Sequence, residues 1–128
     1  MRIMLDTNIF VSMIFFPSTQ TRELAKRLTD SHQIIVCDYV VEELRIVTDR
    51  KFSGKRNDID RFFFELVYTP KMVDLDDLPE IRDPKDSPIL AAAVMEDVDV
   101  FVTGDKDFLF LDIDMPEIVT MADFLKRY

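Results

Sequence analysis

The feature that most constrains the fold is a short apolar segment that ends directly in a carboxylate, and the chain contains it twice. Val100–Thr103 consists of β-branched and aromatic residues, which predicts a buried strand, and Gly104 and Asp105 follow it. Ile3–Leu5 is a similar apolar run, and Asp6 follows it. Ligands of open α/β sheets bind beyond the carboxyl ends of parallel strands. Two aspartates in these positions can therefore share one acidic site, and a shared acidic site indicates a metal ion.

Strand-like segments alternate with helical patterns along the whole chain. Further strands are expected at Gln33–Cys37, near Met72–Val73 and at Glu117–Val119. Helices are expected over 8–16, 21–29, 39–48, 58–66, 87–95 and 121–128. Asp38 is expected to cap the third helix, and Asn57 or Asp58 the fourth. This alternation predicts an α/β fold, a three-layer α/β/α sandwich with a central, mostly parallel, Rossmann-like sheet.

The composition predicts a single folded domain that covers residues 1–128. Apolar residues make up 48% of the chain and charged residues 32%, which is enough for a hydrophobic core. No apolar run approaches the roughly 20 residues of a membrane helix, and the N-terminus lacks a signal-peptide pattern. A single cysteine cannot form an internal disulfide, so a cytoplasmic location is expected.

The net charge of −9 argues against a general nucleic-acid binder, because such proteins bind by neutralising phosphates. It suits a basic partner or a cleft that binds cations, and solubility alone is the alternative explanation. With one histidine and one cysteine in the chain, zinc sites and cysteine–histidine catalysis are poorly supplied with ligands and nucleophiles.

Four carboxylates are expected at the ends or on the inward faces of elements: Asp6, Glu43, Asp86 and Asp105. Glu43 is preferred to its neighbour Glu42 on helical geometry. At ~100° per residue, Glu43 lies ~65° and Glu42 ~165° from the centre of the stripe formed by Val40, Leu44 and Val47. Glu43 therefore flanks the buried side, where a carboxylate needs a partner. A metal ion would be such a partner.

Asp86 is preferred to Asp83 because of its place relative to the Ala-rich helix that begins near Ser87. Asp86 directly precedes that helix, whereas Asp83 precedes Pro84 in an extended loop. A carboxylate at a helix start is held in position. Simple capping of the helix by Asp86 is the alternative, and it stays open on the sequence.

Several carboxylates in one cleft repel each other and need a cation if all are to stay ionised. An all-oxygen site of this kind suits Mg²⁺ or Mn²⁺. Such ions activate water and stabilise the charge on a transferring phosphoryl group. Coincidence is the alternative, since the chain holds 25 Asp and Glu residues.

These residues also carry a resemblance to a known family. The chain resembles PIN-domain ribonucleases, the toxin component of many prokaryotic toxin–antitoxin pairs. The resemblance covers nearly the whole chain and rests on motifs in the family's order: Leu5–Asn8, Val41–Leu44, Asp83–Asp86 with Leu90–Ala93, and Val102–Phe108. The closing segment Ala122–Leu125 looks like the family's C-terminal helix.

The resemblance implies that the four carboxylates form a metal-binding and catalytic quartet. Asn8 and Thr103 would support the quartet by hydrogen bonding, and Asp107 would be an auxiliary acid and metal ligand. The implied reaction is hydrolysis of RNA phosphodiester bonds by activated water, which leaves a 5′-phosphate. The resemblance also implies a cognate antitoxin that covers the cleft, and a homodimer.

The segment 45–61 is the only net basic region of any length and is the candidate for RNA phosphate contacts. Its cationic residues are Arg45, Arg50, Lys51, Lys55, Arg56 and Arg61. A solvated helix end and loop is the alternative. Phe62–Phe64 faces three directions on a helix, so one ring is expected to be exposed. Core packing and a dimer or antitoxin surface are both open for this run.

Other functions stay open on the sequence. A metal-dependent phosphatase with Asp6 as nucleophile usually has a second acid two residues later, where this chain has Asn8. A nucleotidyl enzyme using Asp105 and Asp107 usually ends its first strand in Glu, and a receiver domain has paired acids there. A catalytically inactive PIN-like binding module is the alternative from a different class, and the full quartet argues against it.

Overall fold

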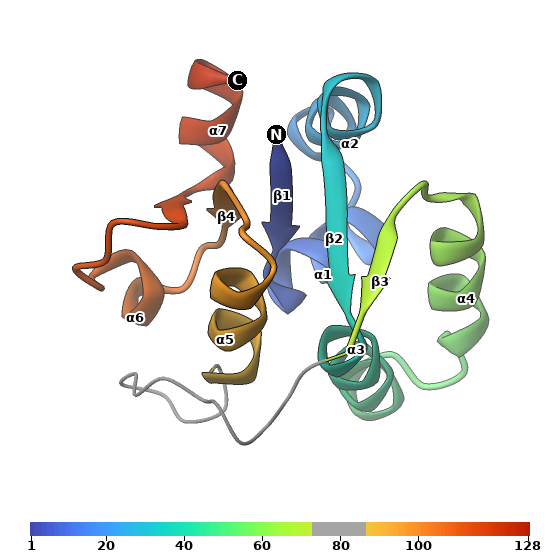
Figure 1. Cartoon of the computed structure of the whole chain (residues 1–128). Helices are drawn as coiled ribbons and strands as arrows, with labels where there is room; N and C mark the ends of the chain where they lie inside the picture. Colours follow the sequence, from blue (N-terminus) through green and yellow to red (C-terminus); the bar gives the residue numbers. More distant parts are fainter. Residues whose placement is uncertain (73–86) are drawn as a thin grey trace.

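The computed structural model describes residues 1–72 and 87–128. Within these ranges, five strands form one parallel sheet in the order β3-β2-β1-β4-β5 (Figure 1). The strands are β1 (Arg2–Leu5), β2 (Gln33–Cys37), β3 (Thr69–Lys71), β4 (Val100–Val102) and β5 (Glu117–Val119). The helices are α1 (Thr7–Phe15), α2 (Thr19–Ser31), α3 (Asp38–Lys51), α4 (Arg56–Glu65), α5 (Ser87–Met95), α6 (Lys106–Leu109) and α7 (Met121–Arg127).

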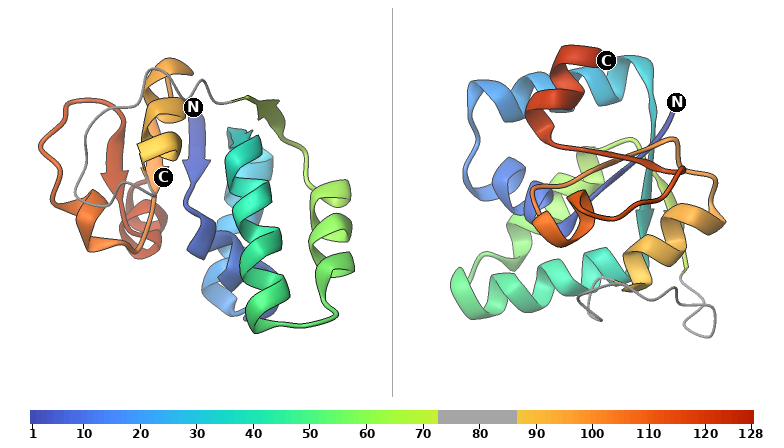
Figure 2. Two further views of the ribbon diagram at one scale, coloured as in Figure 1. Left: turned by 90° about the horizontal axis from the view of Figure 1, so that it is seen from below. Right: turned by 90° about the vertical axis from the view of Figure 1, so that its left-hand side faces the viewer.

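Helices lie on both faces of the sheet, which confirms the predicted three-layer α/β/α sandwich. Helices α1 and α2 lie behind the sheet in Figure 1 and α5 lies in front of it, and Figure 2 shows the same layers from below. The central strand β1 pairs Ile3 with Ile34 of β2 and with Val100 of β4. These three side chains are at most 2% exposed. Strands covered on both faces read as unbroken apolar runs, which is why the sequence showed no polar alternation here.

Because all strands are parallel, their carboxyl ends meet at one edge of the sheet. Helices α1 and α3 both begin at this edge, directly after β1 and β2. The two chain termini lie at the opposite edge (Figure 1). None of the helices in the ranges 1–72 and 87–128 is long and apolar enough to span a membrane.

Three local predictions were wrong. The third strand is Thr69–Lys71 rather than Met72–Val73, of which Val73 lies outside the described residues. Pro70 concealed this strand, because proline is tolerated at a sheet edge but argues against a central strand. Helix α4 starts at Arg56, so neither Asn57 nor Asp58 caps it.

The cap of α3 also differs from the prediction. Cys37 occupies the N-cap position, and Asp38 is the first helical residue. Asp38 still carries a negative charge in the first turn of α3, where it interacts favourably with the helix dipole. The prediction therefore placed the helix start correctly to within one residue and misjudged the role of the aspartate.

Candidate active site

Asp6 lies at the carboxyl end of the central strand β1, in the N-cap position of α1. Its side chain is only 4% exposed, and its backbone N–H donates to the Val102 carbonyl at 3.0 Å. The strand register places Leu5 beside Val102, so the chain segments after β1 and β4 leave the sheet as neighbours. The two strand ends that carry Asp6 and Asp105 are therefore adjacent.

Thr103 joins these two segments through its hydroxyl group. The hydroxyl donates to Asp6 Oδ2 at 2.7 Å and accepts the backbone N–H of Asp105 at 3.0 Å. Thr103 is completely buried, so neither bond competes with bulk water. One hydroxyl thus fixes the Asp6 carboxylate and the backbone from which Asp105 projects. This geometry agrees with the supporting role expected for Thr103.

Asp105 is the N-cap of the short helix α6. Its Oδ1 atom accepts the backbone N–H of Asp107 at 2.9 Å, which holds the carboxylate in one orientation. Both aspartates are half-buried. Phe108, on the next position of α6, is completely buried and packs edge-on against Phe101 at 5.1 Å between ring centroids. The core therefore anchors the helix that presents Asp105.

Glu43 approaches the same edge from α3. It is half-buried while Glu42 is exposed, which is the orientation of the two side chains that helical geometry predicted. The residues of α3 that are fully covered are Val40, Leu44 and Thr48, so Val47 is more open than the predicted stripe implied. Glu43 is close enough to Asp6 for its charge to affect the Asp6 carboxyl.

The pKa of Asp6 is raised above its ordinary value of 3.8, and burial is the main cause. Hydrogen bonding to Thr103 and to the backbone of Thr7 opposes this rise. The negative charges of Glu43 and Asp105 add to it. A buried carboxylate with two further carboxylates in electrostatic reach is an environment that a cation would stabilise.

The remaining predicted members are placed differently. Asp86 lies outside the described residues. Asn8 is exposed on the first turn of α1, and no hydrogen bond joins its side chain to Asp6, Glu43 or Asp105 in the described part of the chain. Within that part, no group of three or more acidic, histidine or cysteine side chains is close enough together to hold a metal ion. The three described carboxylates do not form a complete ligand set by themselves.

The sequence matches the PIN domain family over residues 2–107. The chain belongs to the PIN domain family. The match includes all the carboxylates of the candidate site and the basic segment 45–61. No curated protein sequence matches the chain.

Two solved structures share the fold of this PIN domain. The first is VapBC2 from Rickettsia felis, crystallised bound to a DNA fragment from its promoter. It has a TM-score of 0.72 and 19% identity, over 93% of this chain and 97% of that one. The second is VapC20 from Mycobacterium tuberculosis, a toxin that cleaves the sarcin–ricin loop. It has a TM-score of 0.61 and 16% identity, over 84% of this chain and 92% of that one. At these identities the likeness concerns the fold.

Two cations of the basic segment are occupied by ion pairs on the surface of the PIN domain. Arg45 lies 3.5 Å from Asp60, and Arg56 lies 3.0 Å from Asp49. Arg50, at the end of α3, forms no ion pair with another described residue. These ion pairs favour a structural role on the solvated surface for Arg45 and Arg56. Arg50 is exposed and remains available to contact a phosphate.

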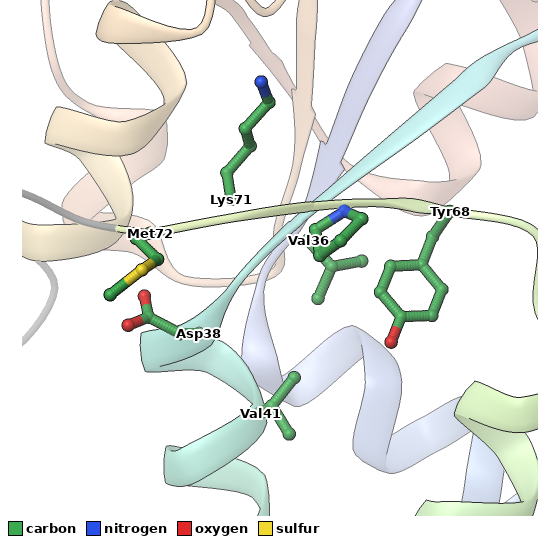
Figure 3. A pocket seen from close by; sticks show the side chains of 7 residues that line it. Val36, Asp38, Val41, Tyr68, Lys71 and Met72 are labelled. Carbon is green, nitrogen blue, oxygen red and sulfur yellow. The ribbon is translucent and has the colours of Figure 1, made fainter.

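A further carboxylate, which was not predicted as a site residue from the sequence, lies at the edge of the sheet where the strands end. Asp38 follows β2 as Asp6 follows β1, and it is exposed. It lines a pocket of about 290 Å³ beside the edge strand, with Val41, Tyr68 and Met72 among the other lining residues. Figure 3 shows Asp38 and Met72 at one end of this pocket and Tyr68 at the other. The pattern of an apolar strand followed by an aspartate also occurs at Asp38. It was not used there because Asp38 was interpreted as a helix cap.

Cys37 and His32 take no part in the candidate site. Cys37 is completely buried, and burial raises the pKa of its thiol to about 11, so the thiol is inert. His32 is half-buried, with its ring edge-on to Phe124 at 5.8 Å between centroids. Its Nδ1 atom lies 3.3 Å from the N-terminal amine, at the opposite edge of the sheet.

Proposed function

We propose that this PIN domain is a metal-dependent endoribonuclease that hydrolyses RNA phosphodiester bonds. One observation carries the proposal: the buried carboxylate of Asp6 is hydrogen-bonded to Thr103 and lies within electrostatic reach of Glu43 and Asp105. Burying a charge without a partner is strongly unfavourable. A carboxylate kept in such a place fits a site that is completed by a cation.

The donor chemistry fits Mg²⁺ or Mn²⁺, because every candidate ligand is a carboxylate oxygen. Asp6, Glu43 and Asp105 would hold the ion, with Asp107 as an auxiliary ligand. Asp86 is proposed as the fourth member, and it lies outside the described residues. When bound, such an ion lowers the pKa of water and stabilises charge on a transferring phosphoryl group.

The protein's own groups supply orientation. The Thr103 hydroxyl fixes one oxygen of Asp6, and the backbone N–H of Asp107 fixes one oxygen of Asp105. Outer hydrogen bonds of this kind hold ligating carboxylates in a single geometry before the ligand arrives. Leu5, Val102 and Phe108, which adjoin Asp6, Thr103 and Asp107 in the sequence, are at most 1% exposed, so the candidate ligands are attached to the hydrophobic core.

The physiological role that we propose is that of the toxin in a toxin–antitoxin pair, with residues 1–128 acting as one nuclease domain. The support is the PIN family membership together with the fold shared with a VapBC complex and with a VapC toxin. A cognate antitoxin and a homodimer belong to this proposal, as does a cytoplasmic location. In cells, expression of the wild-type chain should arrest growth, whereas Asp105→Asn should not.

Cleavage of a pool of single-stranded and structured RNA tests the activity. The wild-type protein should cleave with Mn²⁺ and should lose activity in EDTA. Asp105→Asn should lower the cleavage rate by at least about 100-fold while keeping the circular-dichroism spectrum, and the products should carry 5′-phosphates. Metal-dependent cleavage that persists in Asp105→Asn would remove this residue from the site. No cleavage in Mn²⁺ or Mg²⁺ would favour an inactive binding module.

A further inference from the structure

Three phenylalanines form a cluster at the far end of α1 and α3, which we call the aromatic tip: Phe15, Phe16 and Phe52. The rings of Phe15 and Phe52 stack at 4.4 Å between centroids with 10° between their planes. Phe16 meets Phe52 edge-on at 5.7 Å. Phe16 is 60% exposed, whereas Phe15 and Phe52 are half-buried. Two rings therefore support a third that faces solvent.

The aromatic tip lies at a defined distance from the candidate site, because two helices connect the two places. Helix α1 starts directly after Asp6 and ends at Phe15, and α3 passes Glu43 and ends next to Phe52. The two helices contact each other. Nine helical residues span about 13 Å. A single-stranded nucleic acid of several nucleotides can reach from the carboxylates to the tip.

Three cationic side chains lie in the part of the chain between Glu43 and the aromatic tip or next to the tip. Arg50 lies seven residues after Glu43, on the same face of α3 and about 10 Å further along the helix. Lys51 and Lys55 flank Phe52 on either side in the sequence. All three cations are exposed, and none forms an ion pair within the residues that the structure describes. In a chain of net charge −9, three exposed cations therefore lie close in sequence to a ring that contacts the exposed Phe16.

We propose that the aromatic tip is a second RNA contact, in which Phe16 stacks on an unpaired nucleobase while Arg50, Lys51 and Lys55 contact the phosphates on either side. Aromatic rings beside a cationic path are the usual means by which proteins bind single-stranded nucleic acid without reading its sequence. This inference rests on the proposed function, because it assumes that the same strand enters the carboxylate site. It makes the substrate a single-stranded segment several nucleotides long, with a base stacked about 13 Å from the scissile bond.

A protein partner is the main competing occupant, and charge decides against it. A protein surface that receives an apolar partner is depleted of lysine at its centre. At the aromatic tip, Arg50, Lys51 and Lys55 are exposed and close in sequence to Phe52, whose ring contacts the exposed ring of Phe16. Phosphate and nucleobase together satisfy both kinds of group, whereas an apolar peptide would leave the cations without partners.

RNA binding tests the aromatic tip as an RNA contact. The affinity for a fluorescein-labelled single-stranded 12-nucleotide RNA is measured by fluorescence anisotropy in EDTA, so that no cleavage occurs. Phe16→Ala should weaken binding by about five-fold or more, the lower range for loss of one stacked base. Phe16→Tyr keeps a stacking ring and should bind like the wild type. Phe64→Ala removes a ring that is 90% exposed on α4 and is the matched control, with no expected effect.

A 2-aminopurine base placed in the same RNA reports stacking directly. The wild-type protein and Phe16→Tyr should quench its fluorescence, and Phe16→Ala should not. Arg50→Ala should weaken binding and flatten its salt dependence, whereas Lys126→Ala, an exposed cation on α7, should change neither. With Mn²⁺, Phe16→Ala should raise KM for the 12-nucleotide RNA and leave kcat unchanged.

The outcomes separate this inference from the proposed function. If the wild type cleaves RNA and Phe16→Ala binds RNA with unchanged affinity, the aromatic tip is not an RNA contact, and the proposed nuclease function still holds. If RNA binding depends on Phe16 but the wild type cleaves no RNA, the aromatic tip is an RNA contact and the proposed nuclease function is rejected. A wild-type protein that binds no RNA would overturn the aromatic tip as an RNA contact.

Discussion

Asp6 is the residue on which the account of this PIN domain depends. Its burial, its hydrogen bond from Thr103 and its raised pKa all follow from its position at the end of the central strand. The sequence located this carboxylate because an apolar run ended in it. The sequence alone did not show that Asp6 is more deeply buried than Asp105. Asp105 is less buried because it precedes α6, whose first residue, Lys106, is exposed.

The raised pKa of Asp6 gives a signed prediction for stability. The folded protein binds a proton at this carboxyl more tightly than the unfolded chain, so ionised Asp6 lowers the free energy of unfolding. The loss of stability begins as the pH rises above 3.8, the ordinary pKa of the carboxyl. It is complete once the pH exceeds the raised pKa of the folded protein. In EDTA at pH 7, Asp6→Asn should therefore melt a few degrees above the wild type, and the difference should vanish below about pH 4.

Thermal unfolding from pH 3 to 8 measures this effect. Asp112→Asn, in the exposed loop after α6, is the control and should follow the wild-type curve. An Asp6→Asn protein that melts below the wild type at pH 7 in EDTA would show that the ionised carboxylate stabilises the metal-free fold, contrary to the account.

Thr103 offers a second test at the same scale. Thr103→Val keeps the shape of the side chain and removes the hydroxyl that links Asp6 to the Asp105 backbone. The loss of an outer hydrogen bond to a metal ligand typically lowers activity or metal affinity by about 10–100-fold. We expect kcat/KM with Mn²⁺ to fall by that factor in Thr103→Val and to recover in Thr103→Ser. Full activity in the valine variant would reject the positioning role.

Among the elements, apolar runs and periodic helices were predictable, even where the strand is short, as in β5. Strand β2 followed from its unbroken apolar run and α3 from its apolar spacing, which also separated Glu43 from Glu42. Helix α6 has four residues, which is too short to show a periodic pattern. It was missed although Asp105, its N-cap, was singled out for another reason.

The ends of elements were predicted less well than their centres, for a physical reason. Capping depends on the backbone conformation of one residue, which the sequence constrains only weakly. Lys55 is the N-cap of α4 without a side-chain cap bond, although Asn57 and Asp58 follow it closely. The resemblance to the PIN family placed Thr103 in the site. Its two hydrogen bonds became visible only when β1 and β4 were seen to be neighbours.

At the scale of the whole molecule, the order of the strands brings the candidate site together. Asp6 and Asp105 are far apart in the sequence, and they meet because β1 pairs with β4. Alternating strands and helices predicted a parallel sheet, but no local pattern predicts which strands pair. The sequence therefore named the candidate carboxylates, and the topology brings the three described ones to one edge of the sheet. The aromatic tip escaped sequence reasoning because Phe16 and Phe52 come together only through the contact of α1 with α3.

Titration of Mn²⁺ into the metal-free protein, followed by calorimetry, tests the central claim that Asp6, Glu43 and Asp105 belong to one cation site. We expect saturable binding to the wild type, and a loss of affinity of at least about ten-fold in Asp6→Asn and in Glu43→Gln. Glu42→Gln, on the exposed side of the same helix, should bind like the wild type. Equal affinity in Glu43→Gln and Glu42→Gln, or full affinity in Asp6→Asn, would contradict a shared site.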